Sequence, residues 1–327
     1  MSGFETAAPA AKPRILVISA QGLARFVPAL GALGAIRATH RDAHIVLLTA
    51  PSTSTFAATA PYFDEIWTDD TGGALDVRLL WALRARLKAG AFERVYDLDT
   101  TPHSRRLFWL MYGRRALPLH RAGIPWSGTI PGTALTYGDP RRDAMHLVDR
   151  WAAQLKIAGV GAVLRPDLSW VARQVESFTL PFRMTAPFVL ISATPGPGTP
   201  WPAERYGELA RALAMNGEIP VLVGAGIPPE ISTTVAEFCP SAVDLAARAT
   251  VNETVFLAWA ATGATGPDNG VMHLTAAAGC PTVVLYNAAS DPALVGQRGN
   301  RVSILRRKQL SEIPVGEIVA ALEAPKK

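Results

Sequence analysis

APFVLISATPG (186–196), WPAERYGELARALAMNG (201–217) and EIPVLVGAG (218–226) lie almost end to end in the chain. The first is a short apolar run that leads into a Gly/Pro loop, as a buried β-strand does. The second has helical periodicity, with Pro202 near its start and Gly217 just past its end. The third is another β-rich run. Together they predict a βαβ unit with parallel strands.

The same order of segments occurs near the N-terminus. RILVIS (14–19) precedes a helical stretch at 26–40, and AHIVLLTA (43–50) follows it. Two βαβ openings of similar spacing predict an α/β protein built from two Rossmann-like domains in tandem. The predicted division is a disordered tail over 1–13, an N-terminal domain over 14–175 and a C-terminal domain over 176–327.

The rest of the chain alternates in the same way. Predicted strands lie at 63–67, 94–99, 242–247 and 281–286, and predicted helices lie at 77–90, 142–160, 252–260 and 314–323. The Gly- and Pro-rich segment 113–140 predicts long loops near a cleft. In the first of these helices, four residues form the stripe expected to face the sheet: Leu79, Leu80, Leu83 and Leu87.

The composition is that of a folded protein, with 49% hydrophobic and 18% charged residues in 327. No apolar run reaches the roughly 18 residues that span a bilayer. The N-terminal segment lacks the features of a signal peptide, and Cys239 and Cys280 are two lone thiols. These observations favour a cytoplasmic protein.

The net charge of +5 favours anionic partners, and several arginines come in pairs. A phosphorylated substrate or an acidic lipid surface fits this balance, and a weak attachment to an anionic membrane follows from it. Nucleic acid is not expected, because no aromatic-basic motif of a known reader is present.

One stretch concentrates polar side chains at the edge of an apolar core. GATGPDNGVMHLTAAAGCPTVVLY (263–286) predicts a loop, a short helix and a buried strand, with Asp268, Asn269 and Gly270 before the helix and His273 in its first turn. A helix N-terminus carries unpaired N–H groups and binds phosphates. One of the two cap candidates, Asp268 or Asn269, is expected simply to cap the helix.

This stretch closely resembles the donor-site signature of the heptosyltransferase-like glycosyltransferases of family nine, G-N-D-[TS]-G-x-M-H-x-A-A-A-x-G-x-P. RILVIS, PYFDEIWTDD, WPAERYGELARAL and SDPAL follow in the order usual for that family, so the resemblance covers about 14–323. It implies a GT-B fold, in which two Rossmann-like domains face each other across a cleft.

The resemblance also implies an activity, the inverting transfer of a heptose-like sugar from a nucleotide-diphosphate sugar, commonly ADP-linked, to a lipopolysaccharide or other glycan. The N-terminal domain would take the acceptor and the C-terminal domain the donor, with no cofactor and no metal. Asp268, Asn269, Gly270 and His273 would contact donor diphosphate and sugar. The phosphates would lie along Thr194, Pro195 and Gly196, and Glu230 would hold the ribose.

Two positions depart from the family pattern, and both concern chemistry. Arg25 stands where the family has its catalytic Asp, and an arginine cannot act as a base because it stays protonated. Thr199 and Pro200 stand where the family usually has a cation for the phosphates. Asp97 and Asp99 are the substitute bases that the sequence offers; they form an Asp-x-Asp without the further ligands of a metal site.

Three readings follow. The first is an active glycosyltransferase, cytoplasmic or peripheral at the inner membrane, with a relocated base. The second is a non-catalytic family relative that binds a nucleotide-sugar or a partner protein. The third, an oxidoreductase, is disfavoured because neither first βα loop carries G-x-G-x-x-G.

Overall fold

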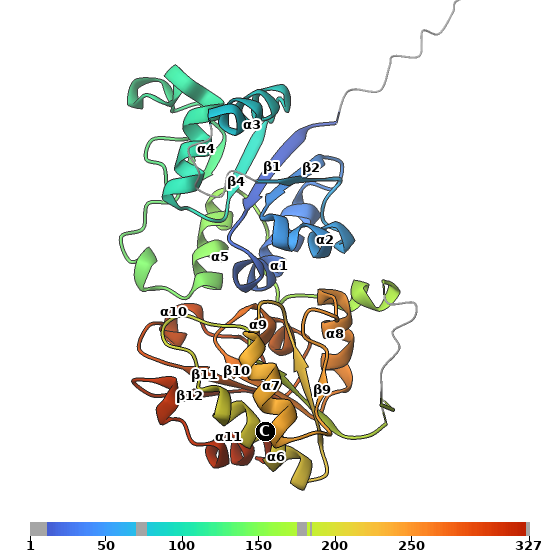
Figure 1. Ribbon diagram of the computed structural model, residues 1–327. Helices are drawn as coiled ribbons and strands as arrows, with labels where there is room; N and C mark the ends of the chain where they lie inside the picture. The colour runs from blue at the N-terminus through green and yellow to red at the C-terminus, as the bar shows by residue number, and fades with distance from the viewer. Residues whose placement is uncertain (1–11, 70–76, 175–181, 184, 325–327) are drawn as a thin grey trace, which may run out of the picture.

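The computed structural model describes residues 12–69, 77–174, 182–183 and 185–324. Nearly all of the predicted tail and the predicted domain boundary at 175/176 lie outside these residues. The described chain folds into two α/β units, each built on a six-stranded sheet in which the paired strands are parallel (Figure 1). The prediction of two Rossmann-like domains in tandem is confirmed.

The N-terminal sheet has the strand order β3-β2-β1-β4-β5-β6. Its strands are β1 (Arg14–Ser19), β2 (His44–Thr49), β3 (Glu65–Thr68), β4 (Arg94–Asp97), β5 (Trp126–Gly128) and β6 (Leu135–Thr136). The helices are α1 (Leu23–Thr39), α2 (Pro51–Thr59), α3 (Val77–Ala89), α4 (Pro102–Tyr112) and α5 (Leu147–Ile157), with 3₁₀ turns η1 (Gly113–Ala116), η2 (Pro118–His120), η3 (Arg142–Ala144) and η4 (Ser169–Arg173).

The C-terminal sheet repeats this topology with the order β9-β8-β7-β10-β11-β12. Its strands are β7 (Phe188–Ser192), β8 (Ile219–Val223), β9 (Val243–Asp244), β10 (Gly263–Pro267), β11 (Thr282–Tyr286) and β12 (Val302–Arg306). The helices are α6 (Ala203–Met215), α7 (Pro229–Phe238), α8 (Val251–Ala260), α9 (Gly270–Ala277), α10 (Pro292–Val295) and α11 (Val315–Glu323), with the 3₁₀ turn η5 (Leu310–Glu312).

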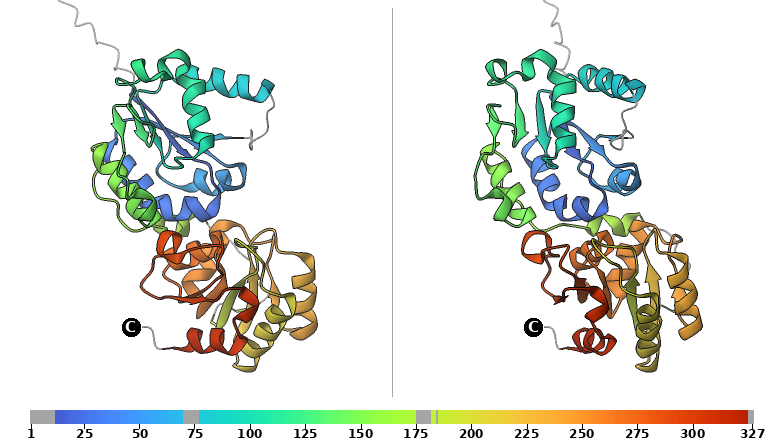
Figure 2. Two further views of the ribbon diagram at one scale, coloured as in Figure 1. Left: turned by 90° about the vertical axis from the view of Figure 1, so that its left-hand side faces the viewer. Right: turned by 60° about the vertical axis from the view of Figure 1, so that its left-hand side comes forward.

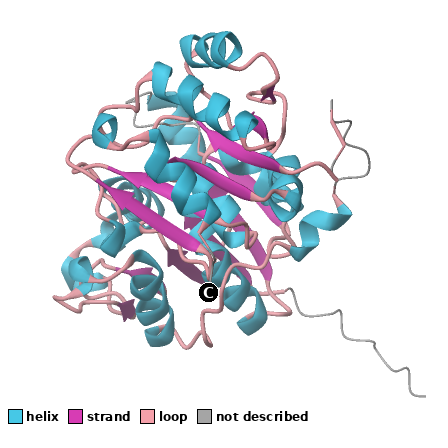
Figure 3. Cartoon of the chain, turned by 90° about the horizontal axis from the view of Figure 1, so that it is seen from below, coloured by secondary structure: helices cyan, strands magenta, loops and turns pink. Residues whose placement is uncertain are grey.

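Helices cover both faces of each sheet, as the C-terminal sheet shows in Figure 3. In β1, Ile15 and Val17 belong to one apolar cluster, while Leu16 and Ile18 belong to another on the opposite face. Successive strand residues point to opposite faces, so a strand buried on both sides must be apolar throughout. This is why the central strands read as unbroken hydrophobic runs.

The segment GATGP was expected to be a loop, and this prediction is wrong. It forms β10, a fully buried strand between β7 and β11. A Cβ at Gly266 would lie 2.4 Å from the Ser192 carbonyl oxygen, so glycine permits a close approach of β7. Glycine and proline are poor strand formers, but packing in the centre of the sheet overrides that preference.

Two further expectations need correction. The segment 113–140 is more than loops, because it adds β5 and β6 to the sheet edge. In α3, Leu83 and Leu87 are buried as predicted, but Leu79 is 42% exposed. The N-terminal half of α3 therefore does not face the sheet.

The two domains touch through α1 and α9. Phe26 and Val27 of α1 belong to the same apolar cluster as Leu274 of α9. A Cβ at Gly270 would lie 2.8 Å from the Leu23 Cβ, so the helix starts meet at a glycine. On the other side of this contact, Arg298 pairs with Asp149 across the domains at 2.5 Å.

Candidate functional site

A cavity of about 620 Å³ lies between the domains, in the size range of small-ligand sites. It is at the carboxyl ends of both sheets, beside the loops that follow β1, β7 and β10. In an open α/β sheet this is the edge where ligands bind. Its lining comprises Gln21, Leu23, Ala24, Arg25, Thr194, Pro195, Gly196, Pro197, Asp268, Asn269, Gly270, His273, Ala289, Ser290, Asp291, Leu294 and Val295.

The starts of two helices border this cavity, α1 from one domain and α9 from the other. Neither helix has an acidic residue in its first turn. Arg25 lies in the first turn of α1 and lines the cavity, and its guanidinium has no hydrogen-bond or ion-pair partner within the described residues. Two helix dipoles and an unpaired cation favour an anionic ligand here.

Asn269 is the N-cap of α9. Its Oδ1 accepts hydrogen bonds from the backbone N–H groups of Val271 at 3.0 Å and Met272 at 3.1 Å. Its Nδ2 donates to the Ser192 hydroxyl at 3.1 Å and to the Thr194 carbonyl at 2.8 Å. The amide therefore joins the helix start to the loop after β7, and the capping reading applies to Asn269 rather than to Asp268.

Asp268 is held by two residues that sequence reasoning did not single out. Its carboxylate accepts hydrogen bonds from the Ser290 hydroxyl at 2.7 Å and from the Gln297 amide at 2.8 Å. Ser290 is the first residue of the segment SDPAL that resembles the family, whereas no sequence pattern indicates Gln297. The Tyr286 hydroxyl donates to Gln297 at 2.9 Å and completes the chain of contacts.

His273 lies next to Asp268, with its Nε2 3.8 Å from Oδ1 of that carboxylate. Burial lowers the pKa of His273 well below its usual range, and the positive charge of Arg25 acts in the same direction. The imidazole is therefore neutral near pH 7 and can donate one hydrogen bond into the cavity.

The loop after β7 supplies the other predicted phosphate contacts. Thr194, Pro195 and Gly196 all line the cavity. A Cβ at Gly196 would lie 2.5 Å from the Asp268 carbonyl oxygen, so this glycine lets the loops after β7 and β10 pack together. The cavity thus collects every predicted donor residue except Glu230.

Glu230 lies in the first turn of α7, exposed and outside the cavity lining. Its role toward the ribose stays a prediction. Thr199 and Pro200, at the position of the family's cation, are exposed in the loop before the buried Trp201 and are likewise absent from the lining.

The two candidate bases at the end of β4 differ in their surroundings. Both oxygens of Asp97 accept hydrogen bonds inside the β4–α4 turn, from the N–H groups of Asp99 and Thr100 and from the Ser104 hydroxyl. Asp97 is only 1% exposed, and burial raises its pKa to about 7. It is therefore sealed from the cleft.

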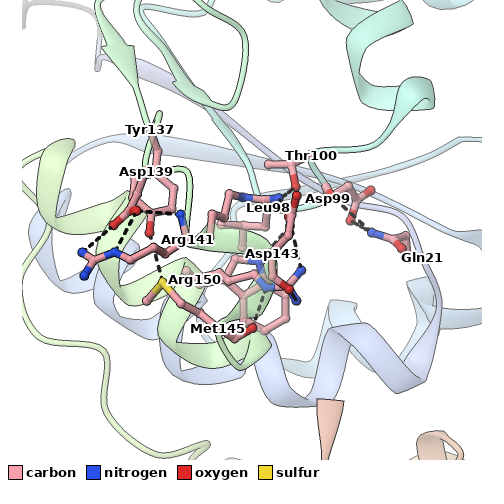
Figure 4. A network of polar contacts seen from close by, with 12 residues as sticks. Gln21, Leu98, Asp99, Thr100, Tyr137, Asp139, Arg141, Asp143, Met145 and Arg150 are labelled. Atoms are coloured by element: carbon pink, nitrogen blue, oxygen red, sulfur yellow. Dashed lines mark hydrogen bonds and ion pairs between the residues drawn. The ribbon is translucent and has the colours of Figure 1, made fainter. Parts of the chain in front are cut away.

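Asp99 points the other way. Its carboxylate accepts hydrogen bonds from the Ala20 N–H at 2.8 Å and from the Gln21 side chain at 3.2 Å, and Gln21 lines the cavity (Figure 4). Burial raises the pKa of Asp99, while these donors and the positive charge of Arg25 oppose the rise. Of the two carboxylates, Asp99 is the one beside the cleft.

Replacing Asp97 by Asn should stabilise the fold at alkaline pH. Because the pKa of Asp97 is raised by folding, its stabilising contribution is complete below its ordinary pKa of 3.8 and is lost as the pH rises toward 7. A shift of this size corresponds to a few kcal/mol in the free energy of unfolding. Urea unfolding at pH 5 and pH 8 measures the difference.

In this experiment the advantage of the Asp97→Asn variant over the natural protein should grow from pH 5 to pH 8. Asp64→Asn is the matched control, because it removes a carboxylate that pairs with Arg37, and it should lower stability at pH 8. An Asp97→Asn variant that is less stable than the natural protein at both pH values would refute the assignment.

Two further arginines, Arg142 and Arg150, lie near the turn that follows β4. Arg142 donates to the Thr100 hydroxyl and to Asp143, yet its Nε is buried without a partner among the described residues. Burial lowers the pKa of Arg150, and the charges of Arg142 and Arg25 lower it further. Figure 4 shows Arg150, which donates to the backbone carbonyls of Met145 and Asp143.

One more titratable pair lies at this edge and was not predicted. His103, in the first turn of α4, is hydrogen-bonded through Nε2 to Asp69. This bond raises the pKa of His103, which is half-buried. No sequence pattern distinguishes this histidine, because its partner follows β3, more than thirty residues earlier.

Two features are absent from the part of the chain that the structure describes. No group of three or more His, Cys, Asp or Glu side chains in that part of the chain is placed to hold a metal ion. Of its helices, none is long and apolar enough to cross a membrane.

Two Rossmann-like domains that face each other across a ligand-sized cavity define the GT-B class of fold. Within this class, residues 80–321 match the description "Glycosyltransferase family 9 (heptosyltransferase)", and the chain belongs to this family. A lipooligosaccharide heptosyltransferase 2 from Haemophilus influenzae is 31% identical over 119 residues, which are 34% of this chain and 33% of that protein.

Solved structures share the fold along nearly the whole chain. A family 9 glycosyl transferase from Veillonella parvula superposes with a TM-score of 0.75 at 18% identity, covering 95% of this chain and 96% of that one. The Escherichia coli heptosyltransferase WaaC with ADP gives 0.74 at 17% identity, covering 95% and 99%. E. coli ADP-heptose LPS heptosyltransferase II gives 0.69 at 20% identity, covering 94% and 97%. The GT-B prediction is confirmed.

Proposed function

We propose that this protein transfers a heptose-like sugar from an ADP-linked donor to an anionic glycan acceptor, with inversion at the anomeric carbon. The observation that carries the proposal is the interdomain cavity in which the donor signature, two helix N-termini and Arg25 meet. Family membership supports the reaction class, and the ADP-bound relative supports the nucleotide.

On the donor side, a diphosphate fits the positive ends of α1 and α9. We assign Arg25 the task that a cation before Trp201 has elsewhere in the family, with the charge delivered from the opposite domain. Neutral His273, which lines the cavity beside Asp268, is suited to donate a hydrogen bond to a sugar or phosphate oxygen. The cation stabilises the negative charge that develops on departing ADP.

On the acceptor side, Asp99 is the proposed general base. It removes the proton from the acceptor hydroxyl as that oxygen bonds to the anomeric carbon and the bond from this carbon to the diphosphate breaks. Arg142 donates to the hydroxyl of Thr100, the residue after Asp99, and Arg150 lies 4.0 Å from the Asp143 carboxylate that Arg142 also pairs with. Positive charge beside the proposed base favours an acidic acceptor, such as a lipopolysaccharide core. For such an acceptor we infer an enzyme that works in the cytoplasm at the inner membrane.

Arg25 at the family's base position motivates a second candidate, a relative that binds a nucleotide-sugar or a partner protein without transfer. Intact donor-side contacts are compatible with both. Both candidates bind a nucleotide-sugar. A thermal-shift titration with ADP, UDP, GDP and their sugars, with and without magnesium, tests this shared property.

ADP at 100 times its Kd should add about 2.7 kcal/mol to the stability of the domain that binds it, a rise of several degrees in Tm. The shift should be specific for ADP, independent of magnesium, and lost on Asp268→Ala. Glu230→Ala should weaken the response if this residue holds the ribose, whereas Glu237→Ala, exposed on the same helix, should not. No shift with any nucleotide would overturn both candidates as donor-binding proteins.

A further inference from the structure

Positive charge is concentrated in one part of the N-terminal domain. Residues 77–121 contain ten Lys and Arg but three Asp and Glu, a net charge of +7, whereas the whole chain carries +5. Two of the three acids, Asp97 and Asp99, are buried in the cleft-side turn after β4. The elements α3, α4, η1 and η2 contain several Lys and Arg residues but no Asp or Glu.

The surface that these elements form exposes large apolar side chains. Trp81 of α3 is 65% exposed and Leu119 of η2 is 91% exposed. The helices pack in sequence, α3 on α4, α4 on η1 and η1 on η2. We call this surface the α3–η2 face. Its further exposed apolar residues are Val77, Trp109 and Leu117.

The α3–η2 face also contains a shallow apolar hollow. A cavity of about 320 Å³ is lined by Val77, Leu80, Trp81, Arg84 and Leu110. The guanidinium of Arg84 lies 5.9 Å from the Trp81 ring centroid and donates to the Leu110 carbonyl at 2.8 Å. This contact fixes one side of the hollow between α3 and α4.

The α3–η2 face lies at the end of the N-terminal domain that points away from the C-terminal domain (Figures 1 and 2). It is therefore separate from the interdomain cavity. Helix α4 connects the two places, because it begins just after Asp99 and ends at η1. Its 11 residues span about 16 Å.

We propose that the α3–η2 face docks on a bilayer surface that contains anionic lipids. Tryptophan and leucine side chains insert at the boundary of headgroups and acyl chains, and exposed arginines such as Arg114 and Arg115 bind lipid phosphates. A second copy of the chain is disfavoured as the occupant, because two such basic faces repel each other. Docking does not depend on the proposed transferase activity.

Co-sedimentation with phosphatidylcholine vesicles containing zero to 40% phosphatidylglycerol tests the proposal on the full chain. Binding should rise with the anionic fraction and fall when the salt concentration is raised. Replacing Trp81 and Leu119 together by Ser should weaken binding at least tenfold, because both side chains lose their insertion into the bilayer. Replacing Arg114 and Arg115 by Glu should weaken it by a similar factor or more.

Matched controls come from the C-terminal domain. Met215→Ser removes another highly exposed apolar side chain, and Arg248→Glu reverses another exposed charge, and both should bind vesicles like the natural protein. Equal loss in these controls, equal binding to vesicles without anionic lipid, or no binding to any vesicle would overturn the proposal. So would a solution dimer that the Trp81→Ser and Leu119→Ser changes dissociate. Unchanged Tm values and far-UV circular dichroism spectra establish that the variants are folded.

Discussion

Replacing Asp99 by Asn should lower the rate of sugar transfer by about 10²- to 10⁴-fold, the usual contribution of a general base. Asn keeps the shape of the side chain and can still accept the Ala20 N–H bond, so the loss reports the missing basicity rather than a missing contact. The measurement is the initial rate of ADP release at saturating donor and acceptor concentrations.

The pH dependence provides a second readout. Burial raises the pKa of Asp99, so activity should rise with pH through a pKa above the ordinary carboxyl value, and this limb should vanish in the Asn variant. The ADP-induced rise in Tm should persist in the Asn variant, because Asp99 does not line the cavity that contains the donor-site residues.

Neighbouring residues provide the controls. Asp97→Asn, two residues away but sealed inside the turn, should leave the rate within a few-fold of the natural value. His103→Gln tests whether His103, the other titratable group at this edge of the sheet, is the base instead of Asp99. If His103→Gln abolishes transfer while Asp99→Asn does not, the base is the His103 imidazole and the assignment of Asp99 is wrong.

The fold was predictable from the sequence where burial dictates composition. Strands such as β1 and β7 are covered on both faces, so each residue had to be apolar and the runs stand out. The strand β10 was missed because close approach of β7 at Gly266 selects a residue that is typical of loops. The strand conformation of β10 depends on this tertiary contact, which no short sequence pattern indicates.

The site was predictable in part for a similar reason. Asp268, Asn269, Gly270 and His273 lie within six residues, so one motif brings them together. Gln297 reaches Asp268 from 29 residues further along the chain, and Arg142 reaches Thr100, next to Asp99, from 42 residues further along. No periodicity or spacing could indicate these partners.

Variants at Arg25 and Pro200 test whether Arg25 has taken over the role of the cation that the family usually has just before Trp201. If Arg25 supplies the cation for the donor diphosphate, Arg25→Asp should lower kcat/KM by about 10²- to 10³-fold, as removal of a charge-stabilising group does. Arg25→Lys should retain more of the activity because it keeps the charge, though not the planar guanidinium.

Pro200→Lys places a cation where the family usually has one, in an exposed loop that the buried Trp201 anchors. Alone it should change the rate little, because Arg25 already neutralises the phosphates. The double variant should recover much of the kcat/KM that Arg25→Asp loses and should not exceed the natural protein, because Asp99 remains the base.

The natural protein, Arg25→Asp, Pro200→Lys and the double variant form a double-mutant cycle. The coupling energy from their kcat/KM values measures how far one cation replaces the other. A double variant that is far faster than the natural protein would contradict this assignment. It would identify the natural chain as a nucleotide-sugar-binding relative whose catalytic base Arg25 replaced.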